Sequence, residues 1–481
     1  MTKIYDILVI GAGPGGHAVA VRAARLGAQV AIIEKNGWGG TCTHRGCIPT
    51  KALLACSHRY AELKTLGRMG VRVADAAFDY SAMKRHQEQM VNISARGVEK
   101  SLKEGGAEMK SGEGRILTPG EVELTAADGS RERLLAKKLV IAWGSETAMP
   151  PGLQPTERIL TSDGILSLET LPESLLIVGG SVIGVEFATL FAELGVKVTL
   201  IEMMDRILPG EEREAVALLV RGLKKLGVSI HTGMKMETIR ETDSRVELLV
   251  VPETPRSKTD KPQVQNLPGV HPSGKEGEIP GFIRPTGTMA LSADYALICT
   301  GRRPRLRLEE LNTLGIRHDQ RGIIVTPQQL TSVPGIYAVG DVTGGMMLAH
   351  RAMQQGKTLA AWLFGDREIR CLEESLPNVI YTHPQIARVG LTEEEALRKG
   401  IAVEVQRADY AANMVARASL LGPGFVKLLF HGEKLAGATI AGDQAGELIA
   451  PLSLAMSAGL DRRQIEEWII PHPTLSEVLG L

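Results

Sequence analysis

Residues 4–34 read IYDILVIGAGPGGHAVAVRAARLGAQVAIIE. An apolar run precedes a glycine-rich turn, an alanine-rich stretch, a second apolar run and an acid, an order that predicts a strand over residues 4–10, a helix and a parallel strand. Gly11 permits the sharp turn, Gly13 lets the backbone approach a pyrophosphate at the helix N-terminus, and Gly16 lets the helix pack on the strand. Glu34 would accept hydrogen bonds from a ribose, so the segment predicts a dinucleotide-binding unit.

Residues 175–202 repeat the pattern as LLIVGGSVIGVEFATLFAELGVKVTLIE. The spacing from the first glycine to the acid is 23 positions in both copies, which predicts a second dinucleotide-binding unit built on Gly179, Gly184 and Glu202. Ser181 stands where the middle glycine is expected and is small enough for a nucleotide to approach. The Glu202 carboxylate suits a free ribose 2′-hydroxyl, and the next three residues hold no arginine for a 2′-phosphate, so NAD is favoured over NADP.

The composition narrows the class of protein. The chain has 481 residues, enough for about three domains, and its 55 Lys and Arg residues balance 55 Asp and Glu residues. The chain therefore has no excess of positive charge that would indicate a nucleic-acid or membrane partner. The first residues lack the pattern of a secretory leader, and we expect a cytoplasmic protein. Residues 175–196 are strongly apolar, but Glu186 and Glu193 favour a buried strand, turn and helix over a membrane span.

Residues 251–285 change in character. They are rich in proline and polar side chains and have no hydrophobic periodicity, so they cannot bury a core. They predict either an exposed loop in the second nucleotide domain or a segment that docks a partner. Strands are expected beyond them, at residues 293–300 and 335–339, each followed by a glycine turn.

Residues 39–51, GGTCTHRGCIPTK, carry a close cysteine pair. On an ideal helix Cα atoms five positions apart are about 8 to 9 Å apart, whereas a disulfide needs less than ~7 Å. Cys42 and Cys47 can therefore bond only if the helix is interrupted, and Gly46 supplies that freedom. A helix N-terminus and Lys51 would favour the thiolate, which predicts a redox-active dithiol. Buried structural cysteines, or zinc ligands together with His44, are the alternatives; no metal site is predicted, because no second ligand pair with metal spacing follows.

Motifs along nearly the whole chain resemble, in order, those of the flavin disulfide reductases. The motifs that carry the resemblance are GAGPGG at 11–16, the cysteine pair, the second glycine turn, TGRRP at 300–304, YAVGD at 337–341, MLAH at 347–350, YTHPQIARVGLTEEEA at 381–396 and HPTLSE at 472–477. The last motif is similar to the acid-base motif of the members that oxidise dihydrolipoamide. The resemblance implies an α/β fold with two Rossmann-like dinucleotide-binding domains plus a C-terminal α+β dimerisation domain. The implied boundaries are an FAD domain at 1–150, an NAD domain at 151–300, a central segment at 301–348 that completes the FAD site, and an interface domain at 349–481.

The resemblance also implies two cofactors, FAD and NAD, and the residues that bind them. The first glycine turn would hold the ADP half of FAD, Asp341 its ribityl chain, and residues 347–350 would lie near the isoalloxazine. The residues expected to bind FAD are Gly11, Gly13, Gly16, Glu34, Thr41, Lys51, Gly114, Gly144, Asp341, Met347, Leu348, Ala349 and His350. Those expected to line the NAD site are Gly179, Gly184, Glu202 and Gly301.

The implied catalytic groups lie in two parts of the chain. Cys47 would face the flavin, Cys42 would exchange with substrate, and Lys51 would pair with Glu186 beside the flavin. The base would be His472, which Glu477 would orient and which would reach in from the other subunit of a homodimer. An imidazole that titrates near neutrality and has a carboxylate partner suits the removal of a thiol proton.

The activity implied is oxidation of dihydrolipoyl groups with NAD, for a lipoyl-bearing protein of a 2-oxoacid dehydrogenase or glycine cleavage type complex. Two alternatives are an NADH-dependent reductase of another disulfide or metal substrate, and a docking component in which catalysis is secondary. Several features depart from the family pattern. Trp143 replaces a usual threonine, and Ile470 stands where many lipoamide-oxidising members have a histidine. Thr43, His44 and Arg45 replace the usual residues between the cysteines and add charge there, and the stretch 251–285 is longer than in the family.

Overall fold

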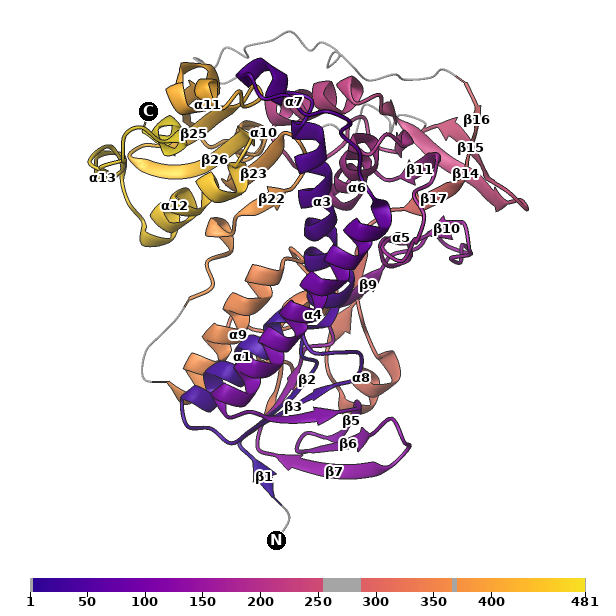
Figure 1. Cartoon of the computed structure of the whole chain (residues 1–481). Coiled ribbons are helices and arrows are strands. Elements are labelled where there is room, and N and C mark those ends of the chain that lie inside the picture. The colour runs from indigo at the N-terminus through magenta and orange to yellow at the C-terminus, as the bar shows by residue number, and fades with distance from the viewer. Residues whose placement is uncertain (1–2, 254–286, 366–369, 481) are drawn as a thin grey trace.

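The computed structural model describes residues 3–253, 287–365 and 370–480 (Figure 1). A parallel sheet in the order β21-β8-β2-β3-β4 forms the centre of the N-terminal part. Helix α1 (Pro14–Arg25) connects β2 to β3 and lies beside α9 (Ala349–Phe364), a helix from much later in the chain. The strands are β21 (Ile336–Ala338), β8 (Leu139–Ile141), β2 (Ile7–Ile10), β3 (Val30–Glu34) and β4 (Glu108–Ser111).

The single strand predicted over residues 4–10 is wrong, because the chain forms two strands there. β1 (Ile4–Tyr5) pairs with β7 (Arg131–Ala136), whereas β2 lies in the central sheet. Asp6 lies between them, and its carboxylate accepts hydrogen bonds from the Gln29 backbone at 2.9 Å and from Lys137 Nζ at 2.8 Å. These two bonds hold the charged side chain outside the sheet and end the first strand.

A second parallel sheet follows in the order β10-β17-β11-β12-β13. Its glycine turn leads into α6 (Val182–Glu193), whose side chains are almost all buried, Glu186 and Glu193 included. The strands are β10 (Ile159–Leu160), β17 (Tyr295–Ile298), β11 (Ser174–Val178), β12 (Lys197–Glu202) and β13 (Ser229–Thr232). The residues predicted as a buried strand, turn and helix therefore have that structure, and nowhere in the described ranges is a helix long and apolar enough to cross a membrane.

An antiparallel ribbon extends from this second unit. It consists of β14 (Met234–Glu241), β15 (Val246–Pro252) and β16 (Met289–Ala293). The strand expected at residues 293–300 is divided, since β16 ends at Ala293 and β17 begins at Tyr295 in another sheet. Two residues of the proline-rich segment belong to β15, and the loop predicted for that segment falls largely on residues 254–285, which lie outside the described residues.

The C-terminal part is an antiparallel sheet in the order β22-β23-β26-β25-β24, covered on one face by α12 (Ala445–Ala458). The strands are β22 (Asn378–Ile380), β23 (Gln385–Gly390), β26 (Lys434–Gly442), β25 (Phe425–His431) and β24 (Glu404–Asp409). Two parallel sheets with crossover helices and one α+β unit confirm the predicted fold class.

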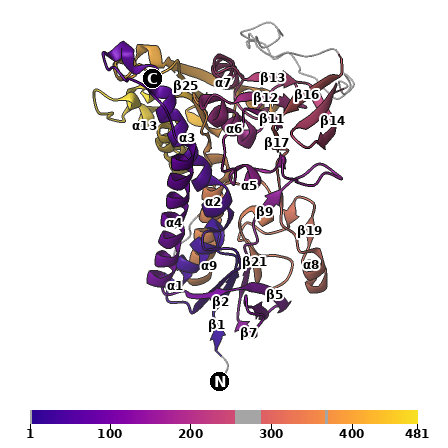
Figure 2. The same cartoon turned by 45° about the vertical axis from the view of Figure 1, so that its right-hand side comes forward.

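Two long helices connect these layers. α3 (Cys47–Glu62) and α4 (Tyr80–Gly105) lie side by side in both views (Figure 1, Figure 2). α3 also packs on α6 of the second unit. The shorter elements are α2 (Gly40–Arg45), α5 (Ser162–Ile165), α7 (Arg213–Lys225), α8 (Leu308–Leu314), α10 (Glu393–Arg398), α11 (Met414–Ala418), α13 (Arg462–Glu466), β5 (Glu113–Thr118), β6 (Glu121–Thr125), β9 (Ser145–Thr147), β18 (Arg302–Pro304), β19 (His318–Asp319) and β20 (Gly322–Ile323).

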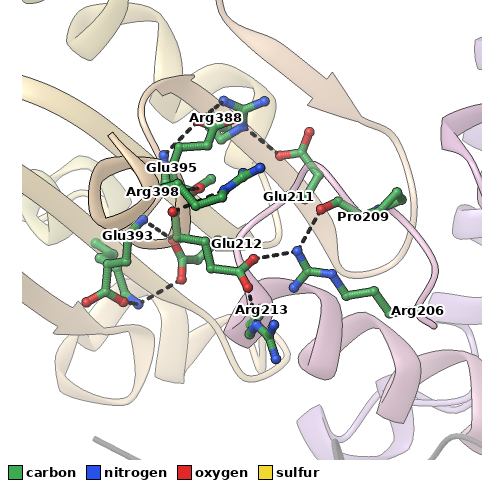
Figure 3. A network of polar contacts seen from close by, with 12 residues as sticks. Arg206, Pro209, Glu211, Glu212, Arg213, Arg388, Glu393, Glu395 and Arg398 are labelled. Carbon is green, nitrogen blue, oxygen red and sulfur yellow. Dashed lines mark hydrogen bonds and ion pairs between the residues drawn. The ribbon is translucent and has the colours of Figure 1, made fainter. Parts of the chain in front are cut away.

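Ion pairs join the second nucleotide unit to the C-terminal sheet (Figure 3). Lys427 of β25 is buried, and its Nζ lies 3.3 Å from Glu212, 2.7 Å from Glu214 and 2.5 Å from Glu393. Nearby, Arg388 of β23 contacts Glu211 at 3.0 Å. Because the Lys427 and Glu212 side chains are both buried, the two units are held together by buried charges as well as by apolar packing.

Candidate functional site

The first glycine turn is built as the sequence predicts. A Cβ at Gly11, where φ is +110°, would lie 2.3 Å from the carbonyl oxygen of Ala142, and one at Gly16 would lie 1.9 Å from that of Gly11. Both positions therefore require glycine. At Gly13, by contrast, no described atom lies within 4 Å of an added Cβ, so this backbone faces open space at the start of α1.

The second turn repeats this geometry closely. A Cβ at Gly179, again with φ of +110°, would lie 2.4 Å from the carbonyl oxygen of Cys299, and one at Gly184 would lie 1.9 Å from that of Gly179. Ser181, at the middle position, donates its hydroxyl proton to the Cys299 carbonyl at 3.2 Å. The serine side chain is thereby held against the adjacent strand, which keeps the turn open.

Each of the two acids also holds its own glycine turn in place. Glu34 accepts the backbone N–H groups of Ala12 at 2.7 Å and Asn36 at 2.8 Å. Glu202 accepts those of Gly180 at 2.6 Å and Met204 at 2.7 Å. Each carboxylate thus fastens its glycine turn to the end of the next strand, and only its remaining lone pairs can face a ribose.

The cysteine pair lies where one helix stops and another begins. Cys42 is on α2, Cys47 is the first residue of α3, and Gly46 between them has φ −143° and ψ −107°, outside the helical region. The interruption predicted from Gly46 is present. The Cys42 thiol donates to the Cys47 sulfur, and this bond, with a further contribution from the charge of Lys51, lowers the pKa of Cys47 to about 7. The same bond and burial raise the pKa of Cys42.

Lys51 and Glu186 form an ion pair beside these thiols. Lys51 Nζ lies 2.9 and 2.7 Å from the two carboxylate oxygens, and the Glu186 side chain is only 4% exposed. The backbone N–H of Tyr381 also donates to Glu186 at 3.0 Å, and Lys51 Nζ lies 4.6 Å from the centre of the Tyr381 ring. Three parts of the chain thereby fix the ammonium group one helical turn after Cys47.

A cavity of about 1000 Å³ brings most of the predicted residues together. It extends from the first glycine turn past the cysteines to Lys51 and Glu186, and it reaches Asp341 and the start of α9. The predicted residues that line it are Gly11, Gly13, Gly16, Glu34, Thr41, Cys42, Cys47, Lys51, Gly114, Gly144, Glu186, Gly301, Asp341, Met347, Leu348, Ala349 and His350. Gly179, Gly184 and Glu202 are not among its lining residues; they form the second turn, whose Ser181 reaches the cavity wall.

His472 and Glu477 also lie outside the lining of this cavity. His472 Nδ1 is 2.7 Å from Glu477 Oε1, and the Thr474 backbone N–H donates to Glu477 Oε2 at 2.9 Å. The His472 hydrogen bond lowers the pKa of Glu477, so the carboxylate is charged. The imidazole is 78% exposed, which leaves its other nitrogen free to face a second molecule.

Several cavity residues were not assigned a role from the sequence. Arg302 Nε donates to Ser145 Oγ at 2.8 Å, and Ser145 Oγ donates to Asp341 Oδ2 at 2.6 Å. Arg302 and Tyr381 lie in the TGRRP and YTHPQ motifs, so those motifs were a usable signal. Ser145 follows the Ala142-Trp-Gly144 turn and has no signal of its own.

The residues that depart from the family pattern also have defined contacts. Trp143 is buried, Arg307 lies 4.8 Å from its ring, and its Nε1 has no hydrogen-bond partner within the described chain. His44 Nε2 is 3.1 Å from the Trp38 carbonyl oxygen, so its ring is engaged away from a thiolate metal site. Arg45 Nε lies 3.7 Å from Asp163 Oδ2 and lines the cavity.

Comparison with known proteins gives consistent matches. Residues 5–356 match the pyridine nucleotide-disulphide oxidoreductase family, and residues 376–481 match its dimerisation domain. The chain is 36% identical over 481 residues to dihydrolipoyl dehydrogenase from Chlorobaculum tepidum, with 99% of this chain and 95% of that protein covered. The solved structure of LpdA from Mycobacterium tuberculosis is similar at a TM-score of 0.86 and 25% identity over 98% of each chain. The HOCl-induced flavoprotein disulfide reductase RclA from Escherichia coli is similar at 0.80 and 26%, over 99% of this chain and 98% of that chain.

Proposed function

The chain belongs to the pyridine nucleotide-disulphide oxidoreductase family, and from this membership we propose that it oxidises dihydrolipoyl groups with NAD as the electron acceptor. It is an oxidoreductase, and relatives about 35% identical over nearly its full length are named dihydrolipoyl dehydrogenase. The observation that carries the proposal is the Cys42 and Cys47 pair, which lies in the large cavity beside the Lys51–Glu186 ion pair.

Members of this family use FAD and NAD, and the residues present fit both. The open space at Gly13 suits a pyrophosphate, and the buried, unpartnered Trp143 Nε1 suits an acceptor in the cavity. FAD would be held by the predicted residues that line the cavity. NAD would be held by Gly179, Gly184, Glu202 and Gly301. Bound FAD would supply the two-electron chemistry that connects the enzyme dithiol to NAD.

The chain's own residues carry the thiol chemistry. In the oxidised enzyme one substrate thiolate attacks Cys42, the Cys42–Cys47 bond breaks, and Cys47 leaves as a thiolate. The Cys42 hydrogen bond that lowers the pKa of Cys47 in the dithiol form is absent while Cys42 is bonded to another sulfur, and the nearby charge of Lys51 then favours Cys47 as the leaving thiolate. The second substrate thiolate then attacks the substrate sulfur bound to Cys42, which closes the lipoyl disulfide and releases the second enzyme thiol. Lys51 stabilises the negative charge that accumulates at Cys47.

His472 is the proposed base for the substrate thiols. Its Nδ1 faces Glu477, so the exposed Nε2 is the atom available to take a proton. Because His472 does not line the cavity of its own chain, we propose that it serves the cavity of the second subunit. The match to a dimerisation domain supports a homodimer. The two residues at the exposed surface before it, Trp468 and Ile469, suit such an interface.

We propose that the macromolecular partner is a lipoyl-bearing protein of a 2-oxoacid dehydrogenase or glycine cleavage type complex, as the named relatives suggest.

NAD is proposed over NADP from Glu202 and the absence of arginine at residues 203–205. A cytoplasmic location stays a prediction. The likeness to RclA, a flavoprotein disulfide reductase, favours a second candidate, an NADH-dependent reductase of another substrate.

The test is anaerobic reaction of the flavin-replete enzyme with dihydrolipoamide and NAD, followed by NADH absorbance. We expect rapid NADH formation, complete loss in Cys42→Ser and strong slowing in His472→Gln. His86→Gln, an exposed histidine on α4, is the matched control and should retain full activity. An enzyme whose thiols are reduced by NADH but which never oxidises dihydrolipoamide would be assigned to the second candidate.

A further inference from the structure

Three side chains with metal-binding atoms meet outside the cavity described above. They are His58 of α3, Glu193 of α6 and His383 of the segment before β23, and their ligand atoms lie within 4.8 Å of one another. His58 Nδ1 is 2.7 Å from Glu193 Oε2, and His383 Nδ1 is 3.0 Å from Glu193 Oε1. One carboxylate therefore lies between two imidazole nitrogens from distant parts of the chain.

The carboxylate is the buried member of this group. The Glu193 side chain is 0% exposed, and Ser57 Oγ donates to its Oε2 at 2.6 Å. The two imidazoles are 21% and 37% exposed, so solvent reaches their edge of the group. This arrangement has a fixed anionic ligand at its base and a route by which an ion could enter.

Asp443 prepares His383 to act as a ligand. Its Oδ1 lies 3.4 Å from His383 Nε2, and its Oδ2 accepts the Gly422 backbone N–H at 3.0 Å. In metal sites a ligating histidine usually donates its other ring N–H to a carboxylate, which fixes the tautomer and the ring orientation. In the structure Nδ1–H of His383 donates to the Glu193 carboxylate, and Asp443 lies beside Nε2. A divalent ion would displace the Nδ1 proton and take its place between the ring and Glu193, with Nε2–H still directed to Asp443.

The His58 ring contacts Glu193 and also the ring of His383, whose centroid lies 5.2 Å away. His58 Nε2 is buried and has no hydrogen-bond partner in the part of the chain that the structure describes, so the contact of Nδ1 with Glu193 is the one hydrogen bond of this ring there. Binding of a metal ion through Nδ1 would replace this hydrogen bond and would leave the ring proton on Nε2.

We propose that His58, Glu193 and His383 bind one divalent transition-metal ion of the zinc class, with Asp443 as the positioning residue. Two imidazole nitrogens and one carboxylate oxygen form a three-ligand set that Zn²⁺ accepts, with water in the fourth position. Ca²⁺ and Mg²⁺ require mostly oxygen ligands, and Cu(I) prefers sulfur, so the donor atoms select against these ions.

The position of the group suggests what the ion would do. Seven positions separate Lys51 from His58, and seven also separate Glu186 from Glu193. The same two faces of α3 and α6 therefore carry the Lys51–Glu186 pair and, two turns further on, the metal ligands. Tyr381 and His383 add the C-terminal segment to both contacts. A bound ion would link α3, α6 and the C-terminal segment next to the redox centre without contacting the cysteines.

The test uses the full flavin-replete enzyme with its cysteine pair kept oxidised, because reduced Cys42 and Cys47 could bind zinc themselves. After removal of metals with a chelator, Zn²⁺ is titrated in competition with a chromophoric chelator. We expect one equivalent of Zn²⁺ per chain. His383→Gln should weaken the affinity by at least about 100-fold and Asp443→Asn by about 10- to 100-fold, whereas the control His86→Gln should leave it unchanged.

X-ray absorption at the zinc edge of the wild-type enzyme keeps the proposal testable if a variant fails to fold. Two imidazole ligands, oxygen and no sulfur are expected. Sulfur ligands, the absence of zinc binding at micromolar concentration, or unchanged affinity in folded His383→Gln would each overturn the proposal and leave the group as an interdomain ion-pair cluster.

Discussion

Lys51 contacts both carboxylate oxygens of Glu186, at 2.9 and 2.7 Å, across 135 positions of sequence. Lys51 lies four residues after Cys47 on α3, so this ion pair holds a positive charge one helical turn from the thiol that has the lowered pKa. The backbone of Tyr381 donates to the same carboxylate. The charge that favours the Cys47 thiolate is thus positioned by the second nucleotide unit and the C-terminal part together.

Replacing Lys51 by methionine should raise the pKa of Cys47 above its value of about 7. The ammonium lowers that pKa, and the Glu186 carboxylate raises it, so loss of Lys51 removes the first effect and leaves the second unopposed. The thiolate of the reduced enzyme forms as pH rises through the pKa, so the midpoint moves to higher pH. The pH profile of Cys47 alkylation under anaerobic conditions, measured by mass spectrometry, reports it.

Glu186→Gln is the matched control, because it removes the opposing charge and should move the same midpoint to lower pH or leave it in place. A midpoint in Lys51→Met equal to that of the wild type would show that the Cys42 hydrogen bond alone sets the pKa of Cys47.

Gly13→Val tests whether the open space at the first turn belongs to a cofactor. The Gly13 backbone has φ −64°, which any residue adopts, so the fold should tolerate the change. The added side chain would occupy the place where a pyrophosphate is expected, and flavin content after purification should fall at least about 10-fold. Gly67→Ala, in another position where a Cβ meets no described atom, is the control and should retain flavin. Full flavin content in Gly13→Val would place the cofactor elsewhere.

Much of the site could be predicted because its determinants are local in sequence. The turns at Gly11 and Gly179 depend on glycines a few residues apart, and the interruption at Gly46 follows from the spacing of two cysteines. The division of residues 4–10 could not be predicted, because it depends on Asp6 meeting Lys137.

Other contacts have no signal in the sequence at all. The Tyr381 bond to Glu186 uses a backbone N–H group that every residue except proline has. The two histidines on Glu193 come from positions 135 and 190 residues away, and only the packing of three units brings them together. The sequence motifs therefore predicted which residues belong to the site, whereas the contacts that position those residues depend on the tertiary structure.

Lys427→Met should destabilise the protein by about 3–5 kcal/mol, because it leaves the buried Glu212 carboxylate without its cation. Burial already raises the pKa of Glu212, which shows that the charged carboxylate is unfavourable at this position, and loss of Lys427 would make it more so. Unfolding in urea should show a lower midpoint for the variant. Lys434→Met, on the neighbouring strand but exposed, is the control. A midpoint unchanged from wild type would show that the ion pairs of Lys427 contribute no net stability, contrary to this prediction.

The position of His472 predicts complementation between one inactive variant and one strongly slowed variant. A Cys42→Ser chain retains its histidine, and a His472→Gln chain retains its cysteines. If each cavity is served by the His472 of the partner subunit, a mixed dimer has one site with both defects and one site with none. Each homodimer of either variant has a defect in both of its sites.

Equal mixing with random exchange should therefore restore about a quarter of the wild-type specific activity, since half of the dimers are mixed and half of their sites are intact. The variants are denatured, mixed and refolded with FAD, and dihydrolipoamide oxidation is measured on the whole mixture. When the two chains are instead coexpressed with different affinity tags and the mixed dimer is isolated, about half of the wild-type activity is expected, because one of its two sites is intact. If His472 instead served its own chain, every site of the mixed dimer would carry one defect. Activity no higher than the mean of the two parent variants would then be observed, and the proposed sharing of the site between subunits would be wrong.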